Sequence, residues 1–149
     1  MNSLLTVSAW GRPDSPFQTF VSVRTACLLA VAGAIATVAV VGLPTVGLVI
    51  GCVSVAGLFS CYPLFSLLWR ERDGRTAELT FTLVGVVAIV LAVTIDPRWL
   101  TLGWAAHGLW DLLHHRDHHT IGLRGIPHWW IQGCVVWDLL AAVGILIFL

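Results

Sequence analysis

An uncharged apolar stretch from Thr25 to Trp69 constrains the fold of this chain more than any other feature. It is too long for one membrane crossing, because a helix spans a bilayer with about 20 apolar residues. Pro44 and the neighbouring Gly42 provide a break, since glycine and proline together are typical of turns. The stretch therefore predicts two transmembrane helices, one on each side of Pro44.

Three more apolar segments follow the charged loop Arg70–Arg75. Asp96 and Pro97 are typical of a helix start, with a capping carboxylate before a proline at the first helical position, and Pro127 marks another start. The leader contains several helix breakers and lacks the features of a secretory signal. The predicted fold is an all-α integral membrane bundle of five transmembrane helices in one domain, 1–149, with a leader at 1–20 and helices at about 21–41, 45–69, 76–95, 97–117 and 127–149.

The composition agrees with a membrane protein and excludes some other classes. Only 11% of the residues are charged, against about 25% in soluble domains. All eight basic residues are arginine, which suggests a GC-rich bacterial genome, and they are too dispersed to indicate nucleic-acid binding. The four cysteines lie in apolar segments without a CxxC spacing, which predicts packing rather than disulfides or a thiolate metal site.

The arginines also predict an orientation. With five crossings and the N-terminus inside, seven of the eight arginines fall on the inner side, and Arg98 falls outside. Because positively charged loops stay in the cytoplasm, we expect the N-terminus inside and the C-terminus outside. The expected location is the inner (plasma) membrane, with the lipid bilayer as the surrounding partner.

The chemistry concentrates in the run from His107 to His119, which holds five of the six histidines. A helix turns by about 100° per residue, so four ionisable side chains of this run fall within about 60° of one another. They are His107, Asp111, His114 and His118, with His115 at the edge of the stripe. Ionisable groups inside a membrane bundle favour a functional site.

Axial distance divides this stripe into two halves, because His107 and His118 lie roughly 16 Å apart along a helix. The upper pair is His107 with Asp111, and the lower pair is His114 with His118. Each pair has the i, i+4 spacing that lets two side chains reach one metal ion. One ion cannot bind both halves.

Neighbouring helices supply further candidates for each half. Asp138 lies about as deep in the last helix as His107 does in the fourth, so the two side chains are placed to meet. Glu78 and His128 begin their helices near the lower pair. A lower site at the cytoplasmic rim is the stronger prediction for a divalent transition metal, Zn²⁺ or Fe²⁺. Its ligands would be His114, His118 or His115, His128 and Glu78.

The run from His107 to His119 resembles the histidine boxes of the membrane fatty-acid and carotenoid hydroxylases. In particular, His115-Arg-Asp-His118-His119 has the HxxHH form. That resemblance implies a di-iron centre at the cytoplasmic face, but this chain has only one more histidine, His128, so carboxylates would have to complete the ligand set. The HGxWDxxHH helix is also similar to small uncharacterised bacterial multi-pass membrane proteins.

Three functions remain open at this point. The leading hypothesis is a metal-binding membrane protein, or a metalloenzyme with a lipid-phase substrate, in which Asp111 or Glu78 acts as ligand or base. The second is a proton or cation relay built from His107, Asp111 and Asp138. The relay acts alone or in a homo-oligomer. The third is an accessory or assembly subunit whose polar stripe docks against a partner in a membrane complex. A purely structural alternative is that buried carboxylates tie helices together while His114 to His119 form a solvated helix end.

Overall fold

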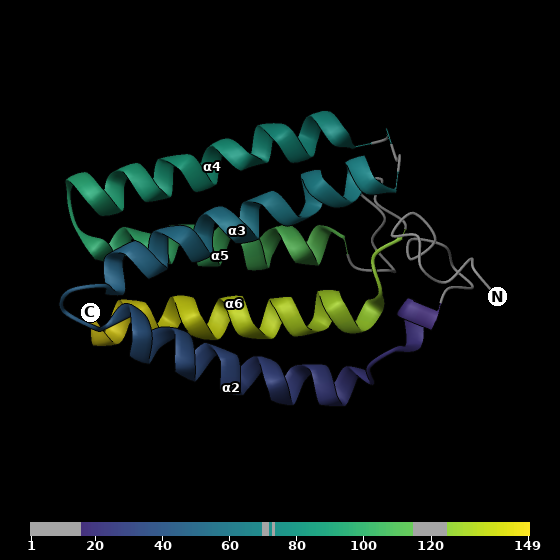
Figure 1. Ribbon diagram of the computed structural model, residues 1–149, viewed down its shortest axis with the longest axis horizontal. Coiled ribbons are helices and arrows are strands. Elements are labelled where there is room, and N and C mark those ends of the chain that lie inside the picture. The colour runs from purple at the N-terminus through teal and green to yellow at the C-terminus, as the bar shows by residue number, and fades with distance from the viewer. Residues whose placement is uncertain (1–15, 70–71, 73, 115–124) are drawn as a thin grey trace.

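The computed structural model describes residues 16–69, 72, 74–114 and 125–149, and these residues form a bundle of α-helices without β-strands (Figure 1). The all-helical prediction is confirmed for this part of the chain. The elements are η2 (Pro16–Thr19), α2 (Val23–Val41), α3 (Gly47–Leu68), α4 (Arg75–Thr94), η3 (Pro97–Trp99), α5 (Leu100–Leu113) and α6 (His128–Phe148).

The helix ends follow local signals that the sequence contains. The turn at residues 42–46 separates α2 from α3 around Pro44, as expected. Asp96 caps η3 by accepting a hydrogen bond of 2.8 Å from the backbone N–H of Arg98. The predicted helix 97–117 therefore begins with a 3-10 turn, and its α-helical part ends at Leu113; residues 115–117 lie outside the described residues. Pro127 is the N-cap of α6 rather than its first helical residue.

Pro63 lies inside α3, where the sequence analysis placed no break. A proline lacks the backbone N–H that would bond to the carbonyl four residues earlier, here that of Phe59. The hydroxyl of Thr82 on α4 lies 3.3 Å from this carbonyl and 3.0 Å from the carbonyl of Glu78, so its one hydrogen is shared between the two acceptors. A side chain from a neighbouring helix thus satisfies the freed group, as membrane helices require.

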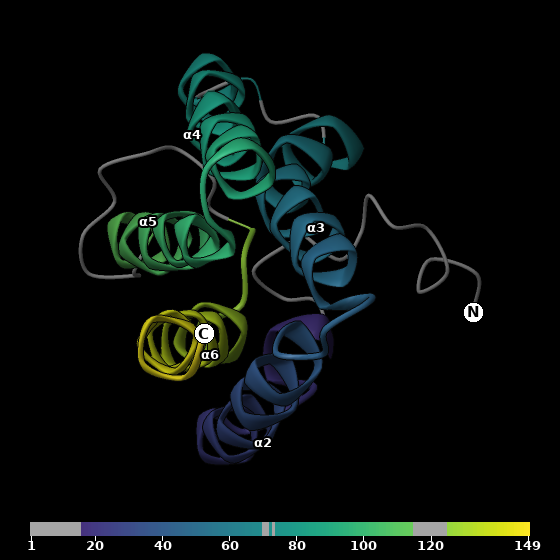
Figure 2. The ribbon, with the colours of Figure 1, turned by 90° about the vertical axis from the view of Figure 1, so that its left-hand side faces the viewer.

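Four of the helices, α2, α3, α4 and α6, are long and apolar enough to cross a membrane. Helix α5 has 14 residues and is shorter than these four. Viewed end-on, α5 lies between α4 and α6, and it also contacts α3 (Figure 2). The short helix therefore packs against three longer ones, and the faces that it turns toward them become buried.

The inside of the bundle is built mainly from small residues, and the outside carries large apolar ones. Side chains such as Ile35 and Val53 are each 67% exposed, which a soluble protein avoids over so large a surface. Small residues at helix contacts are typical of membrane packing, where close approach replaces the hydrophobic driving force. Buried small residues include Ala26, Ala30, Ala34, Gly51, Gly85, Ala88, Ala92, Gly103, Gly108, Ala141 and Ala142.

Gly108 determines how closely α5 and α6 approach beside the polar interior. A Cβ atom at this position would lie 3.1 Å from Cβ of Asp138 and 3.2 Å from a methyl group of Leu139. Because glycine has no side chain, Asp138 reaches the face of α5 that carries His107.

Candidate metal centre

The described residues include six buried polar or charged side chains, and five of them form two groups around α5. We name His107, Asp111 and Asp138 the inner triad, and Glu78 and His114 the rim pair. His114 follows His107 by seven residues on α5, so the two groups are about 10 Å apart along the axis. Each of the five side chains is at most 3% exposed.

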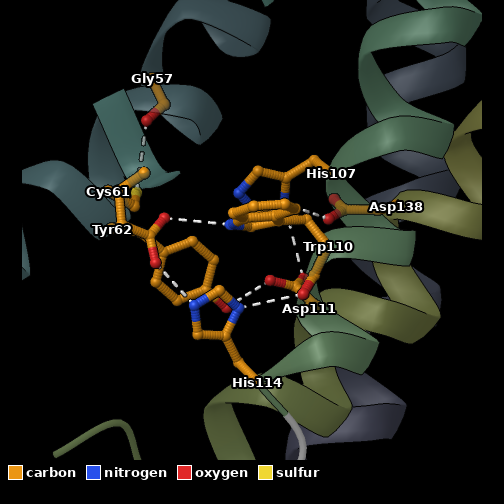
Figure 3. A network of polar contacts seen from close by, with 9 residues as sticks. Gly57, Cys61, Tyr62, His107, Trp110, Asp111, His114 and Asp138 are labelled. Atoms are coloured by element: carbon orange, nitrogen blue, oxygen red, sulfur yellow. Dashed lines mark hydrogen bonds and ion pairs between the residues drawn. The ribbon is translucent and has the colours of Figure 1, made fainter. Parts of the chain in front are cut away.

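The inner triad joins α5 to α6 through His107. Its Nδ1 lies 2.7 Å from Oδ2 of Asp138 and 3.5 Å from Oδ2 of Asp111. Figure 3 shows the imidazole of His107 and the carboxylate of Asp138 directed toward each other. One ligand atom from each of the three residues lies within 4.8 Å of the other two, so this group could hold a metal ion.

Two polar atoms of the inner triad have no hydrogen-bond partner. They are Nε2 of His107 and Oδ2 of Asp111. The other oxygen of Asp111 accepts a hydrogen bond from the hydroxyl of Tyr62 on α3. Buried polar atoms without partners are uncommon in folded proteins, and each calls for an explanation. A metal ion near the Asp111 carboxylate would use this oxygen, which accepts no hydrogen bond and lies 3.5 Å from Nδ1 of His107.

The charges of the inner triad also favour a bound cation or bound protons. Two ionised carboxylates and a neutral imidazole sum to −2, and an isolated charge inside an apolar bundle is costly. Protonating His107 compensates only one of the two negative charges. Two bound protons or one divalent cation would compensate both, so the geometry favours either a metal site or a site that exchanges protons.

The distances are compatible with a metal after a small adjustment. Ligand atoms on a tetrahedral zinc ion with bonds of about 2.1 Å lie about 3.4 Å apart. The separation between Nδ1 of His107 and Oδ2 of Asp111 is 3.5 Å, close to this value. Asp138 is nearer, at 2.7 Å, and would move back by about 0.7 Å. Two oxygens and one nitrogen suit zinc or iron and leave a coordination position for a further ligand.

The rim pair differs from the inner triad, because both ring nitrogens of His114 and both carboxylate oxygens of Glu78 lie within hydrogen-bond distance of a partner. Nδ1 of His114 lies 3.0 Å from the carbonyl of Trp110, which can only accept, so this nitrogen carries the proton. Nε2 of His114 lies 2.6 Å from Oε1 of Glu78, within hydrogen-bond distance. The second oxygen of Glu78 accepts the indole N–H of Trp110 at 3.0 Å. The pair therefore has a complete set of hydrogen bonds without a metal.

Tyr62 lies between the two groups, and the sequence analysis did not include it. Its ring stacks on His114, with centroids 4.4 Å apart and an interplanar angle of 6°. It also stacks on His107 at 5.6 Å and 18° while donating its hydroxyl to Asp111. A signal existed: Tyr62 is the chain's only tyrosine, in an uncharged helix, and a buried tyrosine hydroxyl requires a polar partner.

Among the remaining predicted ligands, the described one, His128, belongs to neither group. His128 lies in the first turn of α6, with its Nε2 3.4 Å from the side-chain nitrogen of Gln132. His115 and His118 lie outside the described residues. Glu78 and His114 do meet, as the prediction of a rim site required. The convergent ligand atoms of the described residues, however, belong to the inner half, which the sequence analysis ranked second.

Comparison with known proteins adds no relative. No protein-family model, curated protein or solved structure matches this chain.

Proposed function

We propose that this chain is a multi-pass membrane protein whose inner triad binds one divalent transition metal ion, zinc or iron. The observation that carries the proposal is the convergence of His107, Asp111 and Asp138 from two helices. Two further observations support it: Oδ2 of Asp111 accepts no hydrogen bond, and two buried carboxyl groups lie beside one imidazole. Four apolar helices long enough to cross a bilayer support the membrane placement, and the arginine distribution supports a cytoplasmic N-terminus.

Such a site has a direct chemical use. A metal ion held by three protein ligands keeps a position for water or substrate, and it acts as a Lewis acid there. Asp111 is held in place by Tyr62, and Asp138 by His107, so neither carboxylate needs to reorganise far. The reaction that we propose to follow from this arrangement is metal-assisted chemistry on a molecule from the lipid phase.

Metal analysis of the full chain tests the proposal. The protein is purified in mild detergent without a histidine tag, stripped with a chelator, reloaded with Zn²⁺ or Fe²⁺ and dialysed. We expect one tightly bound ion per chain in the wild type and none in His107→Gln, which keeps a polar side chain of similar reach. A wild type that retains no ion after reloading rules the metal site out.

A proton relay is the second candidate, because the same geometry favours it for one specific reason. The separation of 2.7 Å between His107 and Asp138 is that of a hydrogen bond, shorter than a metal-bridged contact. Proteoliposomes loaded with a pH-sensitive dye distinguish the two functions. A pH-driven proton flux in the metal-free wild type that disappears in Asp138→Asn supports the relay, whereas flux equal to that of empty liposomes removes it.

A further inference from the structure

A groove opens on the side of the bundle next to the inner triad. It has a volume of about 490 Å³ and is lined by residues of α2, α3 and α6, with Trp104 contributed by α5. The two helices α2 and α3 are joined by the turn at residues 42–46 and diverge away from it, which Figure 1 shows. The groove lies where these two helices separate over α6.

Small residues keep this groove empty of side chains. Ala26 and Ala30 line it from α2, and Gly133 lines it from α6. Gly57 lines it from α3, and a Cβ atom at Gly57 would meet no other atom within 4 Å. The space is therefore open at a defined position, and a larger side chain at Gly57 would project into it without displacing a neighbour.

The groove is apolar along its walls and reaches one charged group. Four tryptophans line it, and two of them are fixed through their indole N–H groups. Trp137 donates to Thr37 at 3.1 Å, and Trp129 donates to the carbonyl of Phe17 at 2.9 Å. Among the lining residues, the charged one is Asp138. Asp138, the member of the inner triad that α6 contributes, thus also lines the groove.

We propose that this groove binds one acyl chain of a membrane phospholipid, which lies along α6 and ends beside Asp138. This inference rests on the membrane placement and names the ligand class for the proposed metal site. In a bilayer, acyl chains surround α2, α3 and α6, and the apolar walls offer water too few hydrogen-bond partners to hold it. The volume falls within the range of about 300–1,000 Å³ that is typical of ligand pockets.

The arrangement of the groove also orients the lipid. Trp129 and Trp130 lie in the first turn of α6 and line one end of the groove. Tryptophans are enriched where a membrane protein meets lipid headgroups. The headgroup therefore lies at the end of the bundle where α6 begins, and the chain runs inward past Cys134 toward Asp138.

Photolabelling with a lipid probe tests this proposal. The full chain is reconstituted in nanodiscs that contain phosphatidylcholine with a diazirine in one acyl chain, irradiated, digested and mapped by mass spectrometry. We expect adducts to concentrate on the groove-facing residues Gly133 and Cys134 and on Cys61. In Gly57→Leu this labelling falls about tenfold, since filling a pocket with extra methylenes typically costs about that factor in affinity.

The matched control is Ala56→Leu, which adds a comparable side chain to the neighbouring residue. Ala56 is exposed and does not line the groove. Its labelling should equal that of the wild type. Labelling spread evenly over all lipid-facing positions, or unchanged in Gly57→Leu, overturns the proposal. If Gly57→Leu does not fold, native mass spectrometry of the wild type decides, and release of every phospholipid in mild detergent overturns it.

Metal analysis of the same samples separates this proposal from the metal site. Gly57→Leu should keep its metal ion while it loses the groove adducts. Groove-specific labelling in a chain without metal supports the lipid site and removes the metal site. A bound metal without groove-specific labelling supports the metal site and removes the lipid site.

Discussion

The rim pair and the inner triad each combine a histidine of α5 with a carboxylate from a neighbouring helix, yet they differ in how far their hydrogen bonds are satisfied. Glu78 has one negative charge and faces one imidazole, and its second oxygen has its own donor in Trp110. The inner triad has two carboxylates for one imidazole, and two of its polar atoms are unpartnered. A complete set of hydrogen bonds is typical of a structural contact, whereas buried polar atoms without hydrogen bonds are typical of a site that receives a ligand.

The two groups also differ in their position relative to the helix ends. Glu78 lies in the first turn of α4, where the helix dipole stabilises a carboxylate, and His114 is the C-cap of α5. His107 and Asp138 lie well inside their helices and have no such help. The rim pair, which has the complete set of hydrogen bonds, thus also has the favourable positions at helix ends. The following variants test this difference between the two groups.

The largest effect should come from breaking the rim pair. In His114→Ala, the buried carboxyl group of Glu78 loses its partner, and removing one member of a buried pair typically costs about 3–5 kcal/mol. Glu78→Gln is the matched control, because an amide can still donate to His114 and accept from Trp110. Unfolding of both variants in detergent measures the difference. Equal stability of the two would show that the rim pair does not stabilise the fold in this way.

Metal binding should stabilise the wild type by a somewhat smaller amount. A ligand at 100 times its dissociation constant raises the free energy of unfolding by about 2.7 kcal/mol. We expect this increase with Zn²⁺ in the wild type and in Glu78→Gln, and none in His107→Gln. Thermal melts with and without the ion provide the measurement. A comparable increase in His107→Gln would place the ion elsewhere.

Tyr62→Phe should separate the two groups, because the hydroxyl serves the inner triad while the ring serves the rim pair. Loss of a hydrogen bond to a charged group costs about 1.5–3 kcal/mol. We expect this cost in the metal-free protein and a smaller one in the loaded protein, where the ion compensates Asp111. Stability measured in both states tests this, and an identical cost in the two states contradicts it.

The smallest effect concerns the approach of α5 to α6. Gly133→Ala should gain up to about 1 kcal/mol from helix propensity, since its new methyl group meets Ala26 at an ordinary 3.5 Å. Gly108→Ala should not show this gain, because its methyl group presses on Asp138 at 3.1 Å. Metal affinity should fall in Gly108→Ala alone. Unchanged affinity there would mean that the spacing of the two helices does not control the site.

The helices themselves could be predicted from the sequence, because the length of an apolar segment and the position of helix-breaking residues are local properties. The turn around Pro44, the cap at Asp96 and the stripe of His107 with Asp111 required no tertiary information. Pro63 is the counterexample: its tolerance within α3 depends on Thr82, which belongs to another helix. The end of α5 at Leu113 was also missed, since the histidine pattern continues beyond it.

The histidines and carboxylates of the candidate site could be predicted from the sequence, but which of them lie close together could not. Equal depth placed Asp138 near His107, and the structure brings their side chains to 2.7 Å. Which half of the stripe gathers ligand atoms depends on how α4 and α6 rotate about their axes, and close contacts such as that at Gly108 set those rotations. Tyr62 comes from a third helix, so no spacing on α5 indicates it.

The most direct test of the central claim is the metal content of Asp138→Asn beside that of Glu78→Gln, both purified without a histidine tag and reloaded with Zn²⁺. Each variant changes one buried carboxylate to its amide and leaves the volume almost unchanged. The inner triad as metal centre predicts no bound ion in Asp138→Asn and one ion per chain in Glu78→Gln. An ion retained in Asp138→Asn and lost in Glu78→Gln would contradict the claim and assign the metal to the rim.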